Sequence, residues 1–323
     1  MALAICIALS LLSLAKSDRH NCSILYKTAD CTSRGLMSVP KDLPIDMISL
    51  DLNHNEIRTL PNNTFERYSM LLTIILDNNK LSVIETDAFS GIKRLLNLSM
   101  EKNTVNFTEF NTNETFRSLK SLELLNIRQN WKIMESSWTY PYLGHLTNLI
   151  YLYIDLTNNP NFTLMDVKKL TKLKIIRFEH CYLTAFKNIT FEDFPDSVEQ
   201  IYFENINFII PHILLVESDF LRPFPNLRVL SLIKMICSLS DALKIVYPFQ
   251  HKSMQAVVFK QIGIPPGNSV VLTEAMVSYL KKVCVKTLVL AENDIVFLGP
   301  NSLASLNIPI ALIQLYCLGT DFP

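Results

Sequence analysis

The sequence is poor in glycine and has no excess of charge of either sign. Only 7 of its 323 residues are glycine, too few for glycine-rich loops that cradle phosphate groups to be prominent. Lysine plus arginine and aspartate plus glutamate both number 30, so the formal net charge is zero. This balance argues against bulk electrostatic attraction to nucleic acid or to an anionic membrane.

The sequence also contains none of the common catalytic or cofactor motifs. H-E-x-x-H, G-x-S-x-G, G-x-G-x-x-G, the P-loop and C-x-x-C are all absent. The six histidines are scattered along the chain. We therefore expect no enzyme activity, no cofactor and no metal site.

Long apolar runs are confined to the start of the chain. Residues 2–14 are mostly apolar, and the small residues Ser13 and Ala15 fit the −3 and −1 positions of a cleavage site. The run is shorter than the roughly 20 residues that a membrane span needs. We predict a signal peptide over residues 1–17, and hence a chain in the secretory pathway that becomes extracellular or cell-surface.

The sequence does contain a repeated frame of apolar residues. Residues 47–57 read MISLDLNHNEI, with apolar residues at places one, four, six and eleven and asparagine at place nine. The frame L-x-x-L-x-L-x-x-N-x-L returns 24 residues later and again after 24 more, which is typical of leucine-rich repeats. It predicts about ten repeats plus a partial eleventh in residues 46–315. Place four is held by Leu50, Ile74, Leu98, Leu125, Leu152, Ile176, Ile201, Leu230, Val257 and Leu288.

Each copy predicts one short strand with one buried face, because apolar and variable places alternate in its middle. A single strand of this kind cannot bury its apolar face, whereas stacked copies can. We predict an α/β leucine-rich-repeat solenoid: a curved horseshoe with a parallel β-sheet on its concave side. The convex side should be irregular or built from short helices.

Place nine predicts a ladder of buried asparagines. Its amide can bond backbone groups of its own and neighbouring turns that would otherwise be unpaired. The expected ladder is Asn55, Asn79, Asn103, Asn130 and Asn293. From repeat six to repeat nine the place holds Cys181, Ile206, Met235 and Ile262 instead, so the ladder should be interrupted there.

Two further features fit a secreted chain. Cys22 and Cys31 directly follow the signal peptide and predict a disulfide in a cap over residues 18–45 that covers the open end of the first repeat. Sequons predict N-glycosylation at Asn21, Asn62, Asn97, Asn106, Asn113, Asn161 and Asn188. Asn97 falls on the concave face, where a glycan would obstruct the surface.

The exposed places of the predicted strands carry a slight acidic excess. Places three, five, seven, eight and ten hold six basic residues: Lys80, Lys102, Arg128, Arg177, Lys234 and Lys260. They hold nine acidic residues: Asp51, Glu56, Asp77, Glu101, Asp155, Glu179, Glu204, Glu292 and Asp294. The difference of −3 has the wrong sign for neutralising phosphates, so nucleic acid is not expected on the concave face.

The same places carry aromatic and apolar side chains in repeats four to nine. These residues are the candidate partner or ligand surface: Trp131, Tyr151, Tyr153, Tyr182, Tyr202, Val229, Ile233 and Val258. Aromatic residues are enriched at interface hot spots. The alternative is that β-propensity alone explains them, although the first three repeats hold mainly polar residues at equivalent places.

The segment CSILYKTADCTSRGLMSVPKDLP, followed by LDLNHNEIRTLPNNTF, resembles the N-terminal cap and first repeat of Toll-like receptors. LKSLELLNIRQN and LTNLIYLYI are similar to the same ectodomains. The resemblance implies a pattern-recognition receptor of innate immunity, which binds a microbial lipid, lipopeptide or protein and pairs with a second receptor chain. Residues 316–323 show no C-terminal cap, transmembrane helix or TIR domain. We therefore expect a truncated or soluble fragment, with membrane attachment only through a missing C-terminal part.

A second class remains open on the sequence. Secreted or adhesive leucine-rich-repeat proteins, such as matrix proteoglycans, neuronal adhesion receptors and variable lymphocyte receptors, share the repeat frame. The repeats here are irregular in length and numerous before any C-terminal cap, which favours the receptor class.

Overall fold

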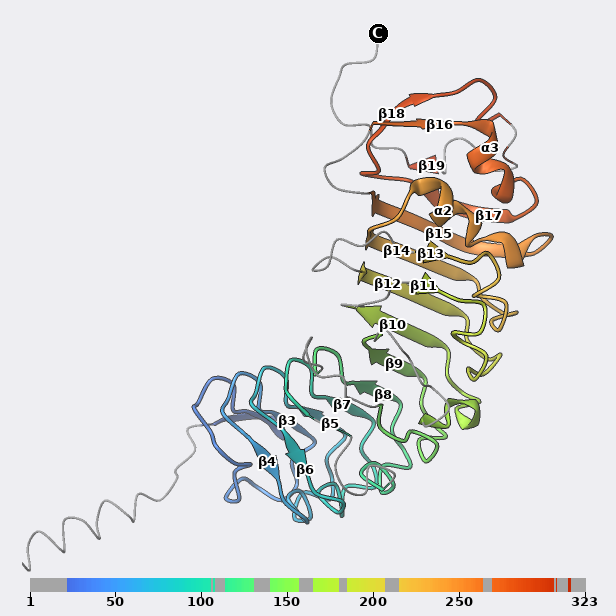
Figure 1. The fold of residues 1–323 in the computed structure, drawn as a ribbon. Helices are drawn as coiled ribbons and strands as arrows, with labels where there is room; N and C mark the ends of the chain where they lie inside the picture. The colour runs from blue at the N-terminus through green and yellow to red at the C-terminus, as the bar shows by residue number, and fades with distance from the viewer. Residues whose placement is uncertain are drawn as a thin grey trace, which may run out of the picture.

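The computed structural model describes residues 22–105, 107, 114–130, 140–156, 165–179, 185–206, 215–263, 269–304, 306 and 313–314. Over these residues the chain is a curved stack of short strands, one per repeat (Figure 1). The strands line the inner side of the bend, and the turns and short helices lie on the outer side (Figure 1). The predicted leucine-rich-repeat solenoid is therefore confirmed.

One thirteen-stranded sheet runs the length of the stack. It begins with the antiparallel hairpin of β1 (Ser23–Leu25) and β2 (Thr28–Asp30), and every later pair is parallel. The remaining strands, in order across the sheet, are β3 (Ser49–Asp51), β5 (Thr73–Ile75), β7 (Asn97–Ser99), β8 (Leu124–Asn126), β9 (Tyr151–Ile154), β10 (Ile175–Glu179), β12 (Gln200–Ile206), β14 (Val229–Met235), β15 (Ser253–Ile262), β17 (Cys284–Val289) and β19 (Ile313–Gln314).

The outer side is irregular, as predicted, with three two-stranded parallel sheets and short helical turns. The sheets are β4 (Thr59–Leu60) with β6 (Val83–Ile84), β11 (Ala185–Phe186) with β13 (Leu215–Val216), and β16 (Val270–Leu272) with β18 (Ile295–Leu298). The helical turns are η2 (Val167–Lys169), α2 (Leu239–Lys244), η3 (Tyr247–Phe249), α3 (Glu274–Val277) and η4 (Ser278–Leu280). No helix in the described ranges is long and apolar enough to cross a membrane.

The register predicted from place four is confirmed. Leu50 pairs with Ile74, Ile74 with Leu98, and this row continues strand by strand to Leu288. All ten residues of the row are at most 1% exposed. A slip of one residue in any strand would turn its apolar set toward solvent, so the unbroken row fixes every strand of the stack.

The asparagine ladder joins neighbouring turns through buried hydrogen bonds. Asn79 Nδ2 donates to Leu52 O of the preceding turn at 2.9 Å and to Leu76 O of its own turn at 3.0 Å. Its Oδ1 accepts from Ile57 N at 3.1 Å. Asn55, Asn103, Asn130 and Asn293 are buried in the same way and also bond backbone atoms of a neighbouring turn. Backbone groups that the turn leaves unpaired are thereby satisfied.

Where the ladder is interrupted, the strands are longer. β3, β5, β7 and β8 have three residues each, whereas β12 and β14 have seven and β15 has ten. The apolar residues at place nine, Ile206, Met235 and Ile262, pair in register and are at most 2% exposed. Cys181 lies outside the described residues.

Place eight adopts a left-handed backbone in eight of the repeats, although Leu156 of repeat five is not among them. The residues are His54, Asn78, Lys102, Gln129, Asn205, Lys234, Gln261 and Glu292, with φ between 52° and 57°. None is glycine, although a left-handed conformation costs other residues roughly 1–2 kcal/mol. The repeated turn imposes this conformation whether or not an asparagine follows at place nine.

The N-terminal cap contains the predicted disulfide between Cys22 and Cys31. The bonded cysteines close the β1–β2 hairpin, and Ala29 of β2 pairs with Leu50 of the first repeat. Ala29 and Cys31 are fully buried, so the hairpin covers the open end of the core as expected.

Candidate interaction surface

The open face of the sheet, opposite the core, is built from places three, five and seven of successive repeats. Because neighbouring strands pair in register, equivalent side chains form continuous rows. The row at place five runs through Asp51, Ile75, Ser99, Asn126, Tyr153, Arg177, Tyr202, Ser231, Val258 and Val289. It changes from polar to aromatic at β9 and to apolar at β15.

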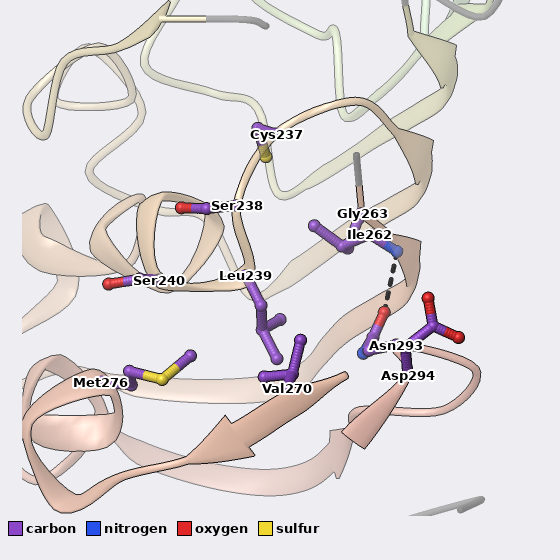
Figure 2. A pocket seen from close by; sticks show the side chains of 10 residues that line it. All are labelled: Cys237, Ser238, Leu239, Ser240, Ile262, Gly263, Val270, Met276, Asn293 and Asp294. Atoms are coloured by element: carbon purple, nitrogen blue, oxygen red, sulfur yellow. Dashed lines mark hydrogen bonds between the residues drawn. The ribbon is translucent and has the colours of Figure 1, made fainter. Parts of the chain in front are cut away.

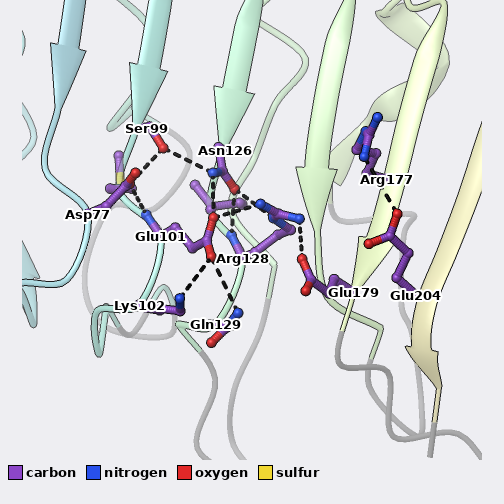
Figure 3. Close-up of polar contacts among 12 residues, drawn as sticks. Asp77, Ser99, Glu101, Lys102, Asn126, Arg128, Gln129, Arg177, Glu179 and Glu204 are labelled. Atoms are coloured by element: carbon purple, nitrogen blue, oxygen red, sulfur yellow. Dashed lines mark hydrogen bonds and ion pairs between the residues drawn. The ribbon is translucent and has the colours of Figure 1, made fainter. Parts of the chain in front are cut away.

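A network of charged groups occupies the middle of this face (Figure 3). Arg128 Nη2 lies 2.7 Å from Glu101 Oε2, and Arg128 Nη1 contacts Glu179 Oε2. Asn126 Nδ2 donates to the same Glu101 oxygen at 2.9 Å. All three ion-pair side chains are only 15–16% exposed, so the network is a fixed part of the surface.

Each charged group in this network favours the ionised form of its partner. Burial opposes ionisation of Glu101, but the hydrogen bond from Asn126 and the guanidinium of Arg128 outweigh it and lower the pKa of Glu101. Burial also opposes the charge on Arg128, yet Glu101 and Glu179 raise its pKa. At the edge of the network, burial raises the pKa of Asp77 even though Ser99 Oγ donates to it at 2.6 Å.

Asp155 departs from the predicted pattern, because place seven was expected to be exposed. Its side chain is buried, with 4% of the residue exposed. Oδ2 accepts from the backbone N–H of Gln129, while Oδ1 has no hydrogen-bond partner among the residues that the structure describes. Burial raises the pKa of Asp155 well above its usual value. Without Asp155, the predicted face has six basic and eight acidic residues, a difference of −2.

Tyrosine and arginine side chains alternate across β8 to β12. The Arg177 guanidinium carbon lies 4.4 Å from the Tyr202 ring centroid and 5.6 Å from the Tyr153 centroid. The Arg128 guanidinium carbon lies 5.5 Å from the centroid of the same Tyr153 ring. These cation–π contacts hold the rings in place, so Tyr153 and Tyr202 present fixed, half-buried aromatic groups to the open face.

The open face becomes apolar beyond β12. Val229 and Ile233 on β14 and Val258 on β15 are half-buried. Val229 belongs to the row at place three that also contains Tyr151 of β9. The structure thus brings Tyr151, Tyr153 and Tyr202 onto one face with these three aliphatic residues. The other two predicted members, Trp131 and Tyr182, lie outside the described residues.

The described sequons lie in two different surroundings. Asn62 and Asn188 are exposed in the turns that follow β4 and β11, on the outer side of the stack. Asn97 lies on the open face in β7, where its Nδ2 is 3.3 Å from Thr73 Oγ1. Asn21, Asn106, Asn113 and Asn161 lie outside the described residues. Attachment of a glycan at any of these positions stays a prediction.

A small apolar cavity lies between the end of β15, the start of α2 and the short helix α3 (Figure 2). Its volume is about 160 Å³, below the roughly 300–1,000 Å³ of pockets that bind small molecules. Cys237 lines it, and burial raises the pKa of this thiol to about 12. A thiol this resistant to ionisation is a poor nucleophile, and Cys237 is a free, buried cysteine.

In the described ranges no three or more histidine, cysteine, aspartate or glutamate side chains are grouped so that they could hold a metal ion. The open face instead presents charged and aromatic side chains that are held in place by ion pairs and cation–π contacts. An open, rigid sheet with such groups defines a class of protein: a leucine-rich-repeat binding scaffold, a fold that is generally non-enzymatic.

Known proteins that resemble this chain are also leucine-rich-repeat proteins, and Toll-like receptors are among them. The leucine-rich-repeat family model matches residues 47–105. Toll-like receptor 3 of Bos taurus is 41% identical over 61 residues, and Toll-like receptor 3 of Mus musculus is 43% identical over 63 residues. These matches cover 19% and 20% of this chain and 7% of each relative. The predicted resemblance to Toll-like receptor ectodomains is thus confirmed.

A solved structure matches over more of the chain. The crystal structure of human 5T4 (Wnt-activated inhibitory factor 1, trophoblast glycoprotein) aligns with a TM-score of 0.56 and 18% identity. The alignment covers 72% of this chain and 87% of that chain. At this identity the likeness concerns the fold.

Proposed function

We propose that this chain is the recognition part of an innate-immune pattern-recognition receptor, located outside the cell or at its surface. Its open face, centred on β9 to β15, binds a microbial lipid, lipopeptide or protein, or a second receptor chain. The observation that carries this proposal is the run of fixed tyrosines beside half-buried aliphatic residues on the open face of the sheet. Such surfaces concentrate binding energy in a few aromatic anchors.

The charged network supports the same role. Arg128, Glu101 and Glu179 satisfy one another within the sheet, so a partner need not neutralise them on binding. Charged pairs at the border of an interface set its register and specificity more than its affinity. We infer that the tyrosines and aliphatic residues provide affinity, and that the neighbouring charges select the partner.

The test is the double variant Tyr153→Ala, Tyr202→Ala in a full-length receptor that carries this ectodomain. Cells with a signalling reporter are challenged with a bacterial lipopeptide, with lipopolysaccharide and with a purified bacterial surface protein. The probe that activates the wild type should require at least about thirtyfold more material for half-maximal response in the variant, because the loss of even one hot-spot ring costs about 2 kcal/mol or more and each 1.4 kcal/mol is tenfold.

A matched control removes two exposed tyrosines elsewhere, Tyr26→Ala and Tyr247→Ala, whose residues are 91% and 45% exposed. Secretion of the isolated ectodomain reports folding of both variants. The control should respond as the wild type does. A normally secreted Tyr153, Tyr202 variant with an undiminished response would refute the proposed surface.

A further inference from the structure

A basic depression lies at the edge of the sheet near the start of β15 and β17, away from the residues of the proposed recognition surface. It has a volume of about 360 Å³ and is lined by His251, Lys252, Lys281, Lys282, Val283 and Cys284. Two backbone hydrogen bonds hold its walls together: His251 N donates to Lys282 O at 2.6 Å, and Cys284 N donates to Lys252 O at 2.9 Å. The lysines therefore come from two adjacent turns held at a fixed spacing.

The surrounding sequence has a local excess of positive charge in an otherwise neutral chain. Residues 245–290 contain five lysines and one glutamate, a difference of +4. The glutamate, Glu274, pairs with Lys281 at 2.6 Å. In the described part of the chain no carboxylate forms an ion pair with Lys252 or Lys282. Their charges are therefore available to an external anion.

Four residues that line the depression, His251, Lys252, Lys282 and Cys284, are exposed. Lys252 Nζ donates to Pro225 O at 3.3 Å and lies 5.8 Å from the Phe249 ring centroid, so the ammonium group is held in place while the residue stays exposed. Lys286 continues the same exposed edge two residues beyond Cys284 on β17. Basic groups thus extend beyond the depression itself along the strand.

We propose that this basic depression binds a linear sulfated polysaccharide of the extracellular matrix or cell surface. A single small anion gains little from exposed lysines, whereas a polymer engages several of them at once and benefits from effective concentration. The depression contains lysines and no arginine, so it offers point charges and lacks the bidentate fork that favours phosphate. No sequon follows Asn188 in the sequence, which leaves this region without a predicted N-glycan.

This inference rests on the extracellular location in the proposed function, and not on the ligand of the open face. The probe is heparin, with chemically desulfated heparin as the charge control. The complete secreted chain is bound to heparin over a range of salt concentrations. The variant Lys252→Gln, Lys282→Gln should raise the dissociation constant roughly tenfold, and the slope of log K against log salt should become shallower by about two.

The matched control is Lys93→Gln, Lys120→Gln, which removes the same charge from two exposed lysines elsewhere. It should bind heparin as the wild type does, and desulfated heparin should not bind. Equal loss in the two variants, or no loss in either, would overturn the site. Tighter binding of duplex RNA than of heparin, lost in the Lys252, Lys282 variant, would overturn the sulfated ligand in favour of nucleic acid. Because binding is measured on the purified chain, failure here leaves the response assay of the open face unaffected.

Discussion

Burial in the folded chain disfavours the ionised form of Asp155 and raises its pKa. Its Oδ1 is buried without a partner in the described part of the chain, and Tyr140 donates its hydroxyl to the Asp155 backbone O at 3.2 Å. Arg128 lowers the pKa of Asp155 less than burial raises it. The folded chain therefore holds a proton on this carboxyl more tightly than the unfolded chain does.

We expect the free energy of unfolding to fall as pH rises from the ordinary value of 3.8 through the raised folded pKa of Asp155. Below 3.8 the carboxyl is protonated in both states and its contribution is fully present. Asp155→Asn removes the ionisable group at nearly constant volume, so the variant should match the wild type at acidic pH and be more stable at pH 8. Urea unfolding at both pH values measures this difference.

Asp46→Asn is the control for this prediction, because Asp46 and its partner Lys27 are both 52% exposed. An exposed ion pair contributes at most about 1 kcal/mol, so this variant should follow the wild-type pH profile. An Asp155→Asn variant with no stability gain at pH 8 would show that solvent reaches the carboxyl.

Some residue-level features could be predicted from the sequence and others could not. Place four was predictable because its apolar period sets the register of the whole sheet. The burial of Asp155 was not, because place seven is also charged in the neighbouring repeats, where Arg128 and Glu179 are partly exposed. The left-handed backbone at place eight was also missed, because residues such as Lys234 and Gln261 give no local signal for it.

Phenylalanine rings form the characteristic element of the outer half of the core. Phe65 stacks on Phe89 at a centroid distance of 5.8 Å, and Phe89 stacks on Phe116 at 6.0 Å. All three rings are fully buried. Each ring comes from one repeat and contacts the ring of the next, so this stack joins repeats on the side opposite the sheet.

Phe89→Ala should lower the free energy of unfolding by about 3–5 kcal/mol, because it leaves a cavity and removes both stacking contacts. The same substitution at Phe297, which is 62% exposed, should change stability by no more than about 0.5 kcal/mol. Urea unfolding followed by circular dichroism compares the two variants. Equal midpoints would mean that the neighbouring repeats close around the lost ring.

The lengths of β12, β14 and β15 could be predicted only in part from the sequence. The loss of asparagine after Asn130 predicted an interrupted ladder, and the structure agrees. That β12, β14 and β15 lengthen there follows from Ile206, Met235 and Ile262 turning into the core. The repeat frame assigns place nine to a turn. It therefore did not predict that these residues would pair with one another across β12, β14 and β15.

At the scale of the whole molecule, the fold was more predictable than its surfaces. Repetition made the solenoid certain, because one strand per repeat must stack to bury its apolar face. The tyrosines of the open face were predicted, whereas their pairing with Arg128 and Arg177 was not, because the partner of each ring lies on a neighbouring strand. The basic depression was also missed, because its lysines come from two turns about thirty residues apart.

The order of the sheet has a mechanical consequence. In the part of the chain that the structure describes, each strand of the thirteen-stranded sheet pairs with its neighbours in the order of the stack, and these bonds point along the stack. A pull on the two ends therefore peels one strand at a time, and no group of bonds shares the load in shear. In an optical trap the array should extend in a series of low-force steps, and a single high-force rupture would contradict this geometry. Under tension the chain should therefore lengthen at low force, one repeat after another.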